Sequence, residues 1–207
     1  MVKYDKKAAL KIIVNAAKEY NEKLNDKQFL IVYRKEKSTG ISCVGFRDMN
    51  FLHMTGVRTK LSAQQFYYAC LESKLSEKDF DVDNKGKVQQ KLTVLPYLAE
   101  LLYHNCMIGD FINSGTFIRA DYFVGNTKAV LSVGFRVGKN VDFPVTLYRE
   151  DVRKLSQPTN KVLAIFVKEY KEQRYNKCTY LSEGQKIHKL PVEEDIKKMI
   201  ILDEELK

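Results

Sequence analysis

The chain has 207 residues, of which 44% are hydrophobic and 29% charged, a composition that excludes a disordered protein and predicts one domain with a packed core. Thirty-five lysines and arginines against 26 aspartates and glutamates give a net charge of +9, which favours a polyanionic partner over a merely lysine-rich surface. No apolar segment resembles a secretion signal or is long enough to cross a bilayer, so we expect a cytoplasmic protein without a membrane partner.

The first two predicted elements are a helix and a hairpin. Apolar residues recur at helical spacing within YDKKAALKIIVNAAKEYNEKL (4–24), which predicts an amphipathic helix with a lysine-rich outer face. Two β-type runs, QFLIVYR and ISCVGF, flank the turn-like linker KEKSTG. Together they predict a hairpin over residues 28–46.

Two further helices are predicted before residue 106. Ser62 followed by Gln65 is typical of a capping box, so SAQQFYYACLES (62–73) is predicted to be helical with Ser62 at its N-cap. The stretch VQQKLTVLPYLAELLYHN (88–105) is also predicted to be helical, but Pro96 lies inside it. Because proline lacks a backbone N–H, we expect a kink or a late helix start there.

The second half of the chain changes character. Between residues 106 and 183, six stretches rich in β-branched and aromatic residues are separated by Gly, Asn and Pro. This pattern predicts an antiparallel meander of four to six strands. The segment REDVRKL (149–155) predicts one helical turn between two of the strands.

Helices first and strands later indicate an α+β fold, with the N-terminal helices and the hairpin packed on a C-terminal antiparallel sheet. Within one domain we expect a mainly helical part over residues 1–105 and a sheet part over residues 106–184. Residues 185–207 are predicted to form an acidic tail or a docking helix. The acids of this tail would also allow it to mask a basic face, although a plain surface helix is the simpler expectation.

No metal site and no cofactor are expected. The four cysteines lie far apart and form no C-x-x-C pair, whereas zinc sites need clustered ligands. The chain has no P-loop, no G-x-G-x-x-G, no H-E-x-x-H and no G-x-S-x-G motif. The segment DVDNKGK (81–87) resembles a calcium loop but lacks the terminal glutamate.

One histidine, several hydroxyls and many cations are left as candidates for chemistry, and this set suits metal-independent cleavage of RNA. The ribose 2′-hydroxyl is the nucleophile in that reaction, so the protein supplies proton transfer and positive charge. His53, within NFLHMTGV, is the candidate general base or acid because histidine titrates nearest to neutral pH. Thr55 is expected to orient the base or the phosphate. The alternative is a packed His53 that hydrogen-bonds to a backbone carbonyl.

Four residues of the predicted sheet complete the candidate catalytic set. Tyr148 is expected to orient the base or the phosphate, Arg119 and Arg149 to stabilise negative charge, and Thr179 to supply a supporting hydroxyl. Polar residues at alternating sites of neighbouring strands can form a floor beneath a phosphate. Each of them could instead be an ordinary solvent-facing position, and Arg119 could pair with Asp121.

A larger set of cations is the candidate nucleic-acid surface. Most of its members follow residue 149 and interleave with tyrosines. Cations that contact phosphates and aromatic rings that stack on bases are typical of single-stranded RNA binding. A solvated basic surface is the alternative. The candidates are Arg58, Lys60, Arg153, Lys154, Lys168, Lys171, Arg174 and Lys177.

Several stretches of the chain resemble, in order, a known family. It is the PBECR group of phage- and mobile-element-borne domains related to barnase, EndoU, colicin and RelE nucleases, and the similarity is greatest to its fourth subgroup. The matching segments are NFLHMTGV, MIGDF, DYFVGNTKAVLSVGF, TLYREDVRKL and KVLAIFVKEY with CTYLSEG. The resemblance runs from the first predicted helix to about Gly184. It implies helices before a four-stranded antiparallel sheet, metal-free ribonuclease chemistry, and His53 with Thr55 as active-site candidates.

The favoured function is a toxin or effector of a phage or mobile element that cleaves RNA, with an antitoxin or a host protein as a possible further partner. The alternative is a catalytically inactive scaffold that binds nucleic acid or a protein, such as a phage-encoded inhibitor of bacterial defence. The scarcity of well-placed acid–base residues supports this alternative. A DNA-binding regulator is a weaker third hypothesis, because no helix-turn-helix with a convincing recognition helix is visible.

Overall fold

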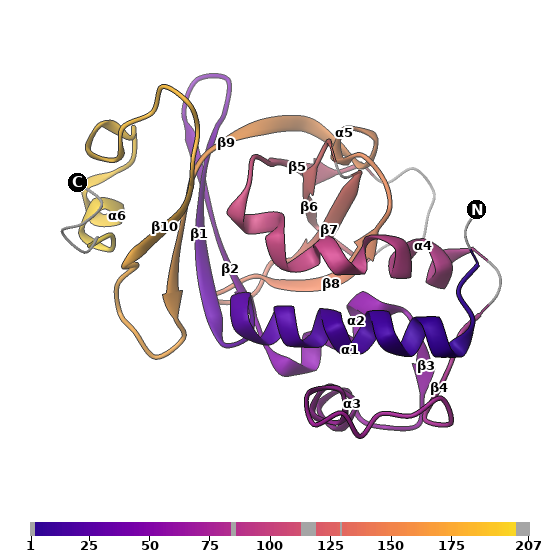
Figure 1. Ribbon diagram of the computed structural model, residues 1–207. Helices are drawn as coiled ribbons and strands as arrows, with labels where there is room; N and C mark the ends of the chain where they lie inside the picture. The colour runs from indigo at the N-terminus through magenta and orange to yellow at the C-terminus, as the bar shows by residue number, and fades with distance from the viewer. Residues whose placement is uncertain (1–2, 84–85, 113–118, 129, 202–207) are drawn as a thin grey trace.

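The computed structural model describes residues 3–83, 86–112, 119–128 and 130–201, and Figure 1 shows their arrangement. The α+β class is confirmed: most of the helices precede residue 104, and a single curled antiparallel sheet dominates the rest. The elements up to that point are α1 (Lys6–Lys23), β1 (Lys27–Arg34), β2 (Thr39–Phe46), α2 (Asp48–Thr55), β3 (Arg58–Thr59), α3 (Ala63–Leu71), β4 (Phe80–Asp81), α4 (Lys87–Val94) and the 3₁₀ helix η1 (Leu95–Tyr103). After it come β5 (Met107–Phe111), β6 (Tyr122–Asn126), β7 (Leu131–Arg136), β8 (Phe143–Tyr148), α5 (Val152–Leu155), β9 (Ser156–Glu169), β10 (Lys177–Leu181), the 3₁₀ helix η2 (Ile187–Lys189) and α6 (Glu194–Lys198).

The predicted first helix forms as α1. The carboxylate of Asp5 caps it by accepting a hydrogen bond from the backbone N–H of Ala8 at 2.7 Å, which satisfies a donor that has no partner inside the helix. The apolar stripe is buried, with Ala9, Ile13 and Tyr20 fully covered. Packing of this stripe against η1, α3 and α2 fixes the helix along one side of the molecule (Figure 1).

The predicted hairpin forms as β1 and β2, and it belongs to the main sheet. The strand order is β2-β1-β9-β5-β6-β7-β8, with β10 also paired to β9. β1 therefore lies between β2 and β9, with Lys27 opposite Phe46 on one side and Glu169 on the other. This sheet has eight strands rather than the four that the family resemblance implies, and the hairpin, which joins it through β9, supplies two of the additional strands.

β9 is long enough to hold both halves of the sheet together. Its first residues pair with β5, and its last residues pair with β1 and β10. The sheet curls until β2 meets the segment before β8: the N–H of Gly45 donates to the carbonyl of Asp142 at 2.8 Å, and the N–H of Asp142 donates to the carbonyl of Cys43 at 2.8 Å. The curl encloses the main hydrophobic core.

The helical segment between β2 and β5 differs in part from its sequence-based prediction. The Ser62–Gln65 capping box is confirmed, with each side chain accepting a hydrogen bond from the other residue's backbone N–H at 3.2 and 3.0 Å. Pro96 marks the point where α4 passes into η1, so the predicted 88–105 helix forms as two. The sequence analysis did not predict α2, which carries His53.

The C-terminal segment packs on the outer face of β1, β9 and β10. Ile187, Leu190, Ile196 and Met199 contact a second hydrophobic cluster there, and Figure 1 shows the segment on the side of β1 away from α4. The α6 acids pair within their own helix, Glu194 with Lys197 and Asp195 with Lys198. Among the described residues, none of the helices combines the length and the apolarity that crossing a bilayer requires.

Candidate functional site

A cavity of about 220 Å³ opens between the β8 edge of the sheet, α4 and the end of α2. β8 is the last strand of the sheet, so one of its edges faces these two helices. Three cationic side chains line the cavity, Lys87, Lys91 and Arg149, together with the hydroxyl residues Thr146 and Tyr148. We call this space the lysine cavity; its lining is completed by Gly56, Val88, Gln90 and Leu147.

Lys91 is the most perturbed cation of the lysine cavity. Burial, and then repulsion from Lys87 one turn earlier on α4, lower the pKa of its ammonium group to about 8. Its Nζ donates a hydrogen bond to the backbone carbonyl of His53 at 2.8 Å. A lysine with this pKa can exchange a proton near neutral pH, which an ordinary surface lysine does poorly.

Gly56 gives Lys91 the room that it occupies. Gly56 ends α2 in the left-handed conformation, with φ at +72°, which residues with a side chain rarely adopt. A Cβ at this position would lie 2.7 Å from Cδ of Lys91. The glycine of the NFLHMTGV stretch is therefore required both by the turn and by the lysine stem that packs over it.

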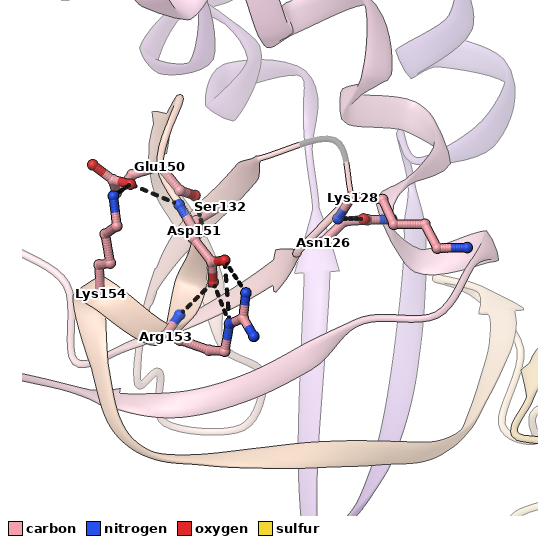
Figure 2. A network of polar contacts seen from close by, with 7 residues as sticks. All are labelled: Asn126, Lys128, Ser132, Glu150, Asp151, Arg153 and Lys154. Carbon is pink, nitrogen blue, oxygen red and sulfur yellow. Dashed lines mark hydrogen bonds and ion pairs between the residues drawn. The ribbon is translucent and has the colours of Figure 1, made fainter.

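Tyr148 and Arg149 enter the lysine cavity from the end of β8. The ring of Tyr148 packs edge-on against Phe123 with centroids 6.0 Å apart, and burial raises the pKa of its hydroxyl. A hydrogen bond fixes the turn after Arg149 to β7: the hydroxyl of Ser132 donates to the carbonyl of Glu150 at 2.8 Å. Figure 2 shows this anchor. Arg149 itself is exposed, and no ion pair joins it to the part of the chain that the structure describes.

The imidazole of His53 opens onto a neighbouring space. His53 lies on the exposed face of α2 and lines a cavity of about 470 Å³ with Arg47, Met49, Phe143 and Tyr170. We call this space the aromatic cavity; Gly45, Asn50, Ala63, Val141, Asp142, Pro144 and Val145 complete its lining. On β8, Val145 lines the aromatic cavity and the next residue, Thr146, lines the lysine cavity. The two spaces are therefore neighbours along this strand.

Three members of the candidate catalytic set lie outside both cavities. Thr55 is fully buried, and its hydroxyl donates to the carbonyl of Leu52 at 2.8 Å, which places it in the end of α2. The hydroxyl of Thr179 donates to the carbonyl of Leu102 at 2.7 Å and ties β10 to η1. Arg119 is exposed and precedes β6 instead of lying within a strand. The structure therefore brings Tyr148 and Arg149 together, with His53 next to them.

The candidate nucleic-acid residues are spread over three places. Arg58 and Lys60 line a separate surface cavity of about 320 Å³ around β3 and β4. Arg153 and Lys154 lie in α5 and are engaged in ion pairs with Asp151 at 2.6 Å and with Glu150 at 3.2 Å (Figure 2). The remaining four, Lys168, Lys171, Arg174 and Lys177, lie on and around the β9–β10 turn.

The described residues include no group of three or more His, Cys, Asp or Glu side chains placed to hold a metal ion. Sequence reasoning missed Lys87 and Lys91, the two α4 lysines of the lysine cavity. The signal present in the sequence was the i, i+4 spacing of two like charges on a predicted amphipathic helix. That spacing alone is equally typical of a solvated helix face.

The chain matches one family model. The model is PBECR4, described as phage-Barnase-EndoU-ColicinE5/D-RelE like nuclease4, and the match covers residues 12–184. The match begins within α1 and ends after β10, so it includes all residues of both cavities. No curated protein and no solved structure matches the chain.

Proposed function

Because the chain belongs to the PBECR4 family of phage-Barnase-EndoU-ColicinE5/D-RelE like nucleases, we propose that it is an RNA endonuclease whose cleavage site is the lysine cavity. The observation that carries the proposal is the convergence of Lys87, Lys91 and Arg149 in one cavity, with the pKa of Lys91 lowered to about 8. Three cations suit a phosphodiester and its developing charge, and a lysine that titrates near neutral pH supplies acid–base chemistry.

In the proposed reaction the ribose supplies the nucleophile. The neutral amine of Lys91 accepts the proton of the 2′-hydroxyl, and the 2′-oxygen bonds to phosphorus as the bond to the 5′-oxygen breaks. Water returns a proton to the 5′-oxygen, and the hydroxide that is left takes up the proton held by Lys91. Lys87 and Arg149 offset the negative charge that grows on the phosphate oxygens, and the hydroxyl of Tyr148, kept protonated by burial, donates a hydrogen bond to one of them. The products carry a 2′,3′-cyclic phosphate and a 5′-hydroxyl.

The part played by His53 stays a prediction. Its carbonyl accepts the hydrogen bond of Lys91, so the backbone of His53 positions that amine whatever its side chain does. The imidazole lines the aromatic cavity next to the cleavage site. An RNA backbone that passes from one cavity to the other would bring a ribose within reach of it, which is the arrangement that a histidine base or acid requires.

One experiment addresses the chemistry and both candidate groups. The protein is incubated with single-stranded RNA in EDTA, and the same oligonucleotide with 2′-deoxyribose serves as the matched substrate. Cleavage of RNA alone, with cyclic-phosphate ends, is the expected result. Lys91→Met should cleave at least about 100-fold more slowly, the usual range for loss of an acid–base group, whereas Lys128→Met, an exposed lysine outside the cavity, should cleave normally.

His53→Ala separates the two candidates for proton transfer. A loss as large as that of Lys91→Met assigns the imidazole to the chemical step, and a loss of less than tenfold leaves Lys91 as the base. Equal cleavage of the 2′-deoxy substrate would contradict the proposed reaction, because no 2′-hydroxyl is present to attack. Near-normal cleavage by Lys91→Met would remove the lysine from the mechanism.

The biological setting belongs to the same proposal. The family description names phage nucleases that include colicins and RelE, which supports a toxin or effector of a phage or mobile element, with an antitoxin or host protein as partner. A binding module that has lost catalysis is the second candidate. It is favoured by the hydroxyl of Thr55, which is committed to the backbone and unavailable to substrate. Salt-sensitive RNA binding without any cleavage would identify that module.

A further inference from the structure

The aromatic cavity has the chemistry of a nucleobase site. Phe143 and Met49 line it and are 39% and 53% exposed, so apolar surface is available inside an open space of about 470 Å³. Tyr170 lines the same space. Aromatic and apolar side chains of this kind stabilise the binding of an unpaired base, because every base has a face that can stack on them.

Arg47 lies at the wall of the aromatic cavity and contacts Tyr170, Asp26 and Asn50. Its guanidinium carbon lies 3.4 Å from the centroid of the Tyr170 ring, and Nη1 forms an ion pair with Asp26 at 2.5 Å. Its backbone N–H donates to the side chain of Asn50 at 2.9 Å. Arginine stacked on tyrosine presents a planar donor edge, which suits the acceptor atoms of a base or the oxygens of its phosphate.

Two further features favour nucleic acid as the occupant. The turn that carries Tyr170 also carries the exposed cations Lys171 and Arg174, so phosphate-binding charge lies close to this ring along the chain. The aromatic cavity and the lysine cavity are also lined by consecutive stretches of β8, up to Val145 in the first and from Thr146 in the second. The five-residue step from Phe143 to Tyr148 spans about 17 Å at the rise of a β-strand, a length that a short single-stranded segment can follow.

We infer that the aromatic cavity binds an unpaired base of the RNA, next to the phosphodiester held in the lysine cavity. This inference rests on the proposed function and adds a substrate class to it: single-stranded RNA or an unpaired loop. A base inside an A-form duplex is stacked and paired, so it cannot enter the cavity. Phe143 binds the face of the base, while His53 and Arg47, which Tyr170 supports through its ring, lie at its edge.

The test measures binding of an oligonucleotide that cannot be cleaved. A fluorescent single-stranded RNA with 2′-O-methyl riboses is titrated with the full-length protein, and each base is removed in turn by an abasic substitution. One position is expected to weaken binding by about tenfold when its base is removed. The same abasic substitution should have no effect on binding to Phe143→Ala, because the stacking partner is already absent.

Tyr97→Ala is the matched control, since Tyr97 is a 56% exposed aromatic residue on η1 that lines neither cavity. It should retain the abasic effect. Tyr170→Leu serves as the second variant, and circular dichroism checks that both cavity variants fold. The inference fails if no single base matters, or if its effect persists unchanged in both cavity variants. Base-dependent binding by a protein that does not cleave would keep the inference and overturn the proposed function.

Discussion

The β8 end of the sheet and the β10 region use the same kinds of side chain in opposite ways. Beside β8, three residues with an amine, a hydroxyl and a guanidinium group line one cavity: Lys91, Tyr148 and Arg149. Near β10, the hydroxyl of Thr179 donates to the carbonyl of Leu102, and the ammonium of Lys168 donates to the carbonyl of Glu172 at 2.6 Å. The second set is satisfied by the protein itself and stabilises the fold. In the first set, Lys91 uses one of its three N–H donors on the carbonyl of His53, and Arg149 forms no ion pair within the described residues, so this set leaves capacity for a ligand.

The largest expected difference between the two regions concerns charge and pH. The pKa of Lys91 is about 8 in the folded protein against an ordinary 10.4. Below pH 8 the amine of Lys91 is protonated in both the folded and the unfolded state. Desolvation of this charge then lowers the free energy of unfolding by its full amount. Between pH 8 and 10.4 only the unfolded chain keeps the proton, so this lysine's contribution to the free energy of unfolding rises with pH.

The measurement is urea denaturation of the parent and of Lys91→Met at pH 7 and pH 10. The parent should gain about 2 kcal/mol relative to the variant between these two values. Other groups titrate in this range, but they do so in both proteins and cancel in the difference. A difference that stays constant with pH would mean that Lys91 is not desolvated, and the contrast with the β10 region would weaken.

Two arginines that lie four residues apart, Arg149 and Arg153, test whether a cation must line the lysine cavity to affect cleavage. Arg149 lines the cavity, whereas Arg153 is engaged by Asp151 through two of its nitrogens (Figure 2). We expect Arg149→Ala to reduce RNA cleavage by about 100-fold, as loss of one oxyanion donor commonly does. Arg153→Ala should lower it less than about threefold, because that charge is already compensated. Equal effects of the two substitutions in a single-turnover assay would contradict this distinction.

Gly56→Ala tests the wall of the lysine cavity. The left-handed conformation at this position costs a residue with a side chain about 1–2 kcal/mol, and the added Cβ would displace the stem of Lys91. Thermal denaturation should detect the lower stability, and the cleavage rate should fall more than stability alone explains. Gly184→Ala is the control, since it has a similar φ of +77° with no atom within 4 Å of the added Cβ.

The smallest effect is expected from Thr179→Val, which tests the β10 region as the other substitutions test the lysine cavity. Removing its hydroxyl leaves the carbonyl of Leu102 without that donor, which should lower the free energy of unfolding by about 1 kcal/mol. Cleavage by the folded protein should remain at the parental rate. A loss of activity without a loss of stability would return Thr179 to the candidate catalytic set.

The sequence predicted most elements because their signals are local. The amphipathic stripe of α1, the Ser62–Gln65 box and the break at Pro96 depend on residues close together in the chain. By contrast, α2 is short and mixes apolar with polar residues, and its end at Gly56 is defined by a backbone conformation. Pairing of β1 with β9 joins segments about 135 residues apart, which no local pattern reveals.

The candidate site was predicted only in part for the same reason. Tyr148 and Arg149 were found because they end a recognisable strand, whereas Lys91 looked like one of many lysines. Its unusual pKa arises from burial beside Gly56 and from Lys87 on its own helix. Thr55 and Thr179 were overestimated because a sequence gives the hydroxyl but not the carbonyl that binds it.

The length of β9 has a consequence for synthesis of the chain. Because its fourteen residues pair with β1, β5 and β10, the sheet cannot be completed until Ser156–Glu169 have left the ribosome. Until then one edge of β1 has no neighbour, and unpaired edges invite association with other chains. A nascent chain that has not yet released β9 therefore has an incomplete sheet and an exposed strand edge.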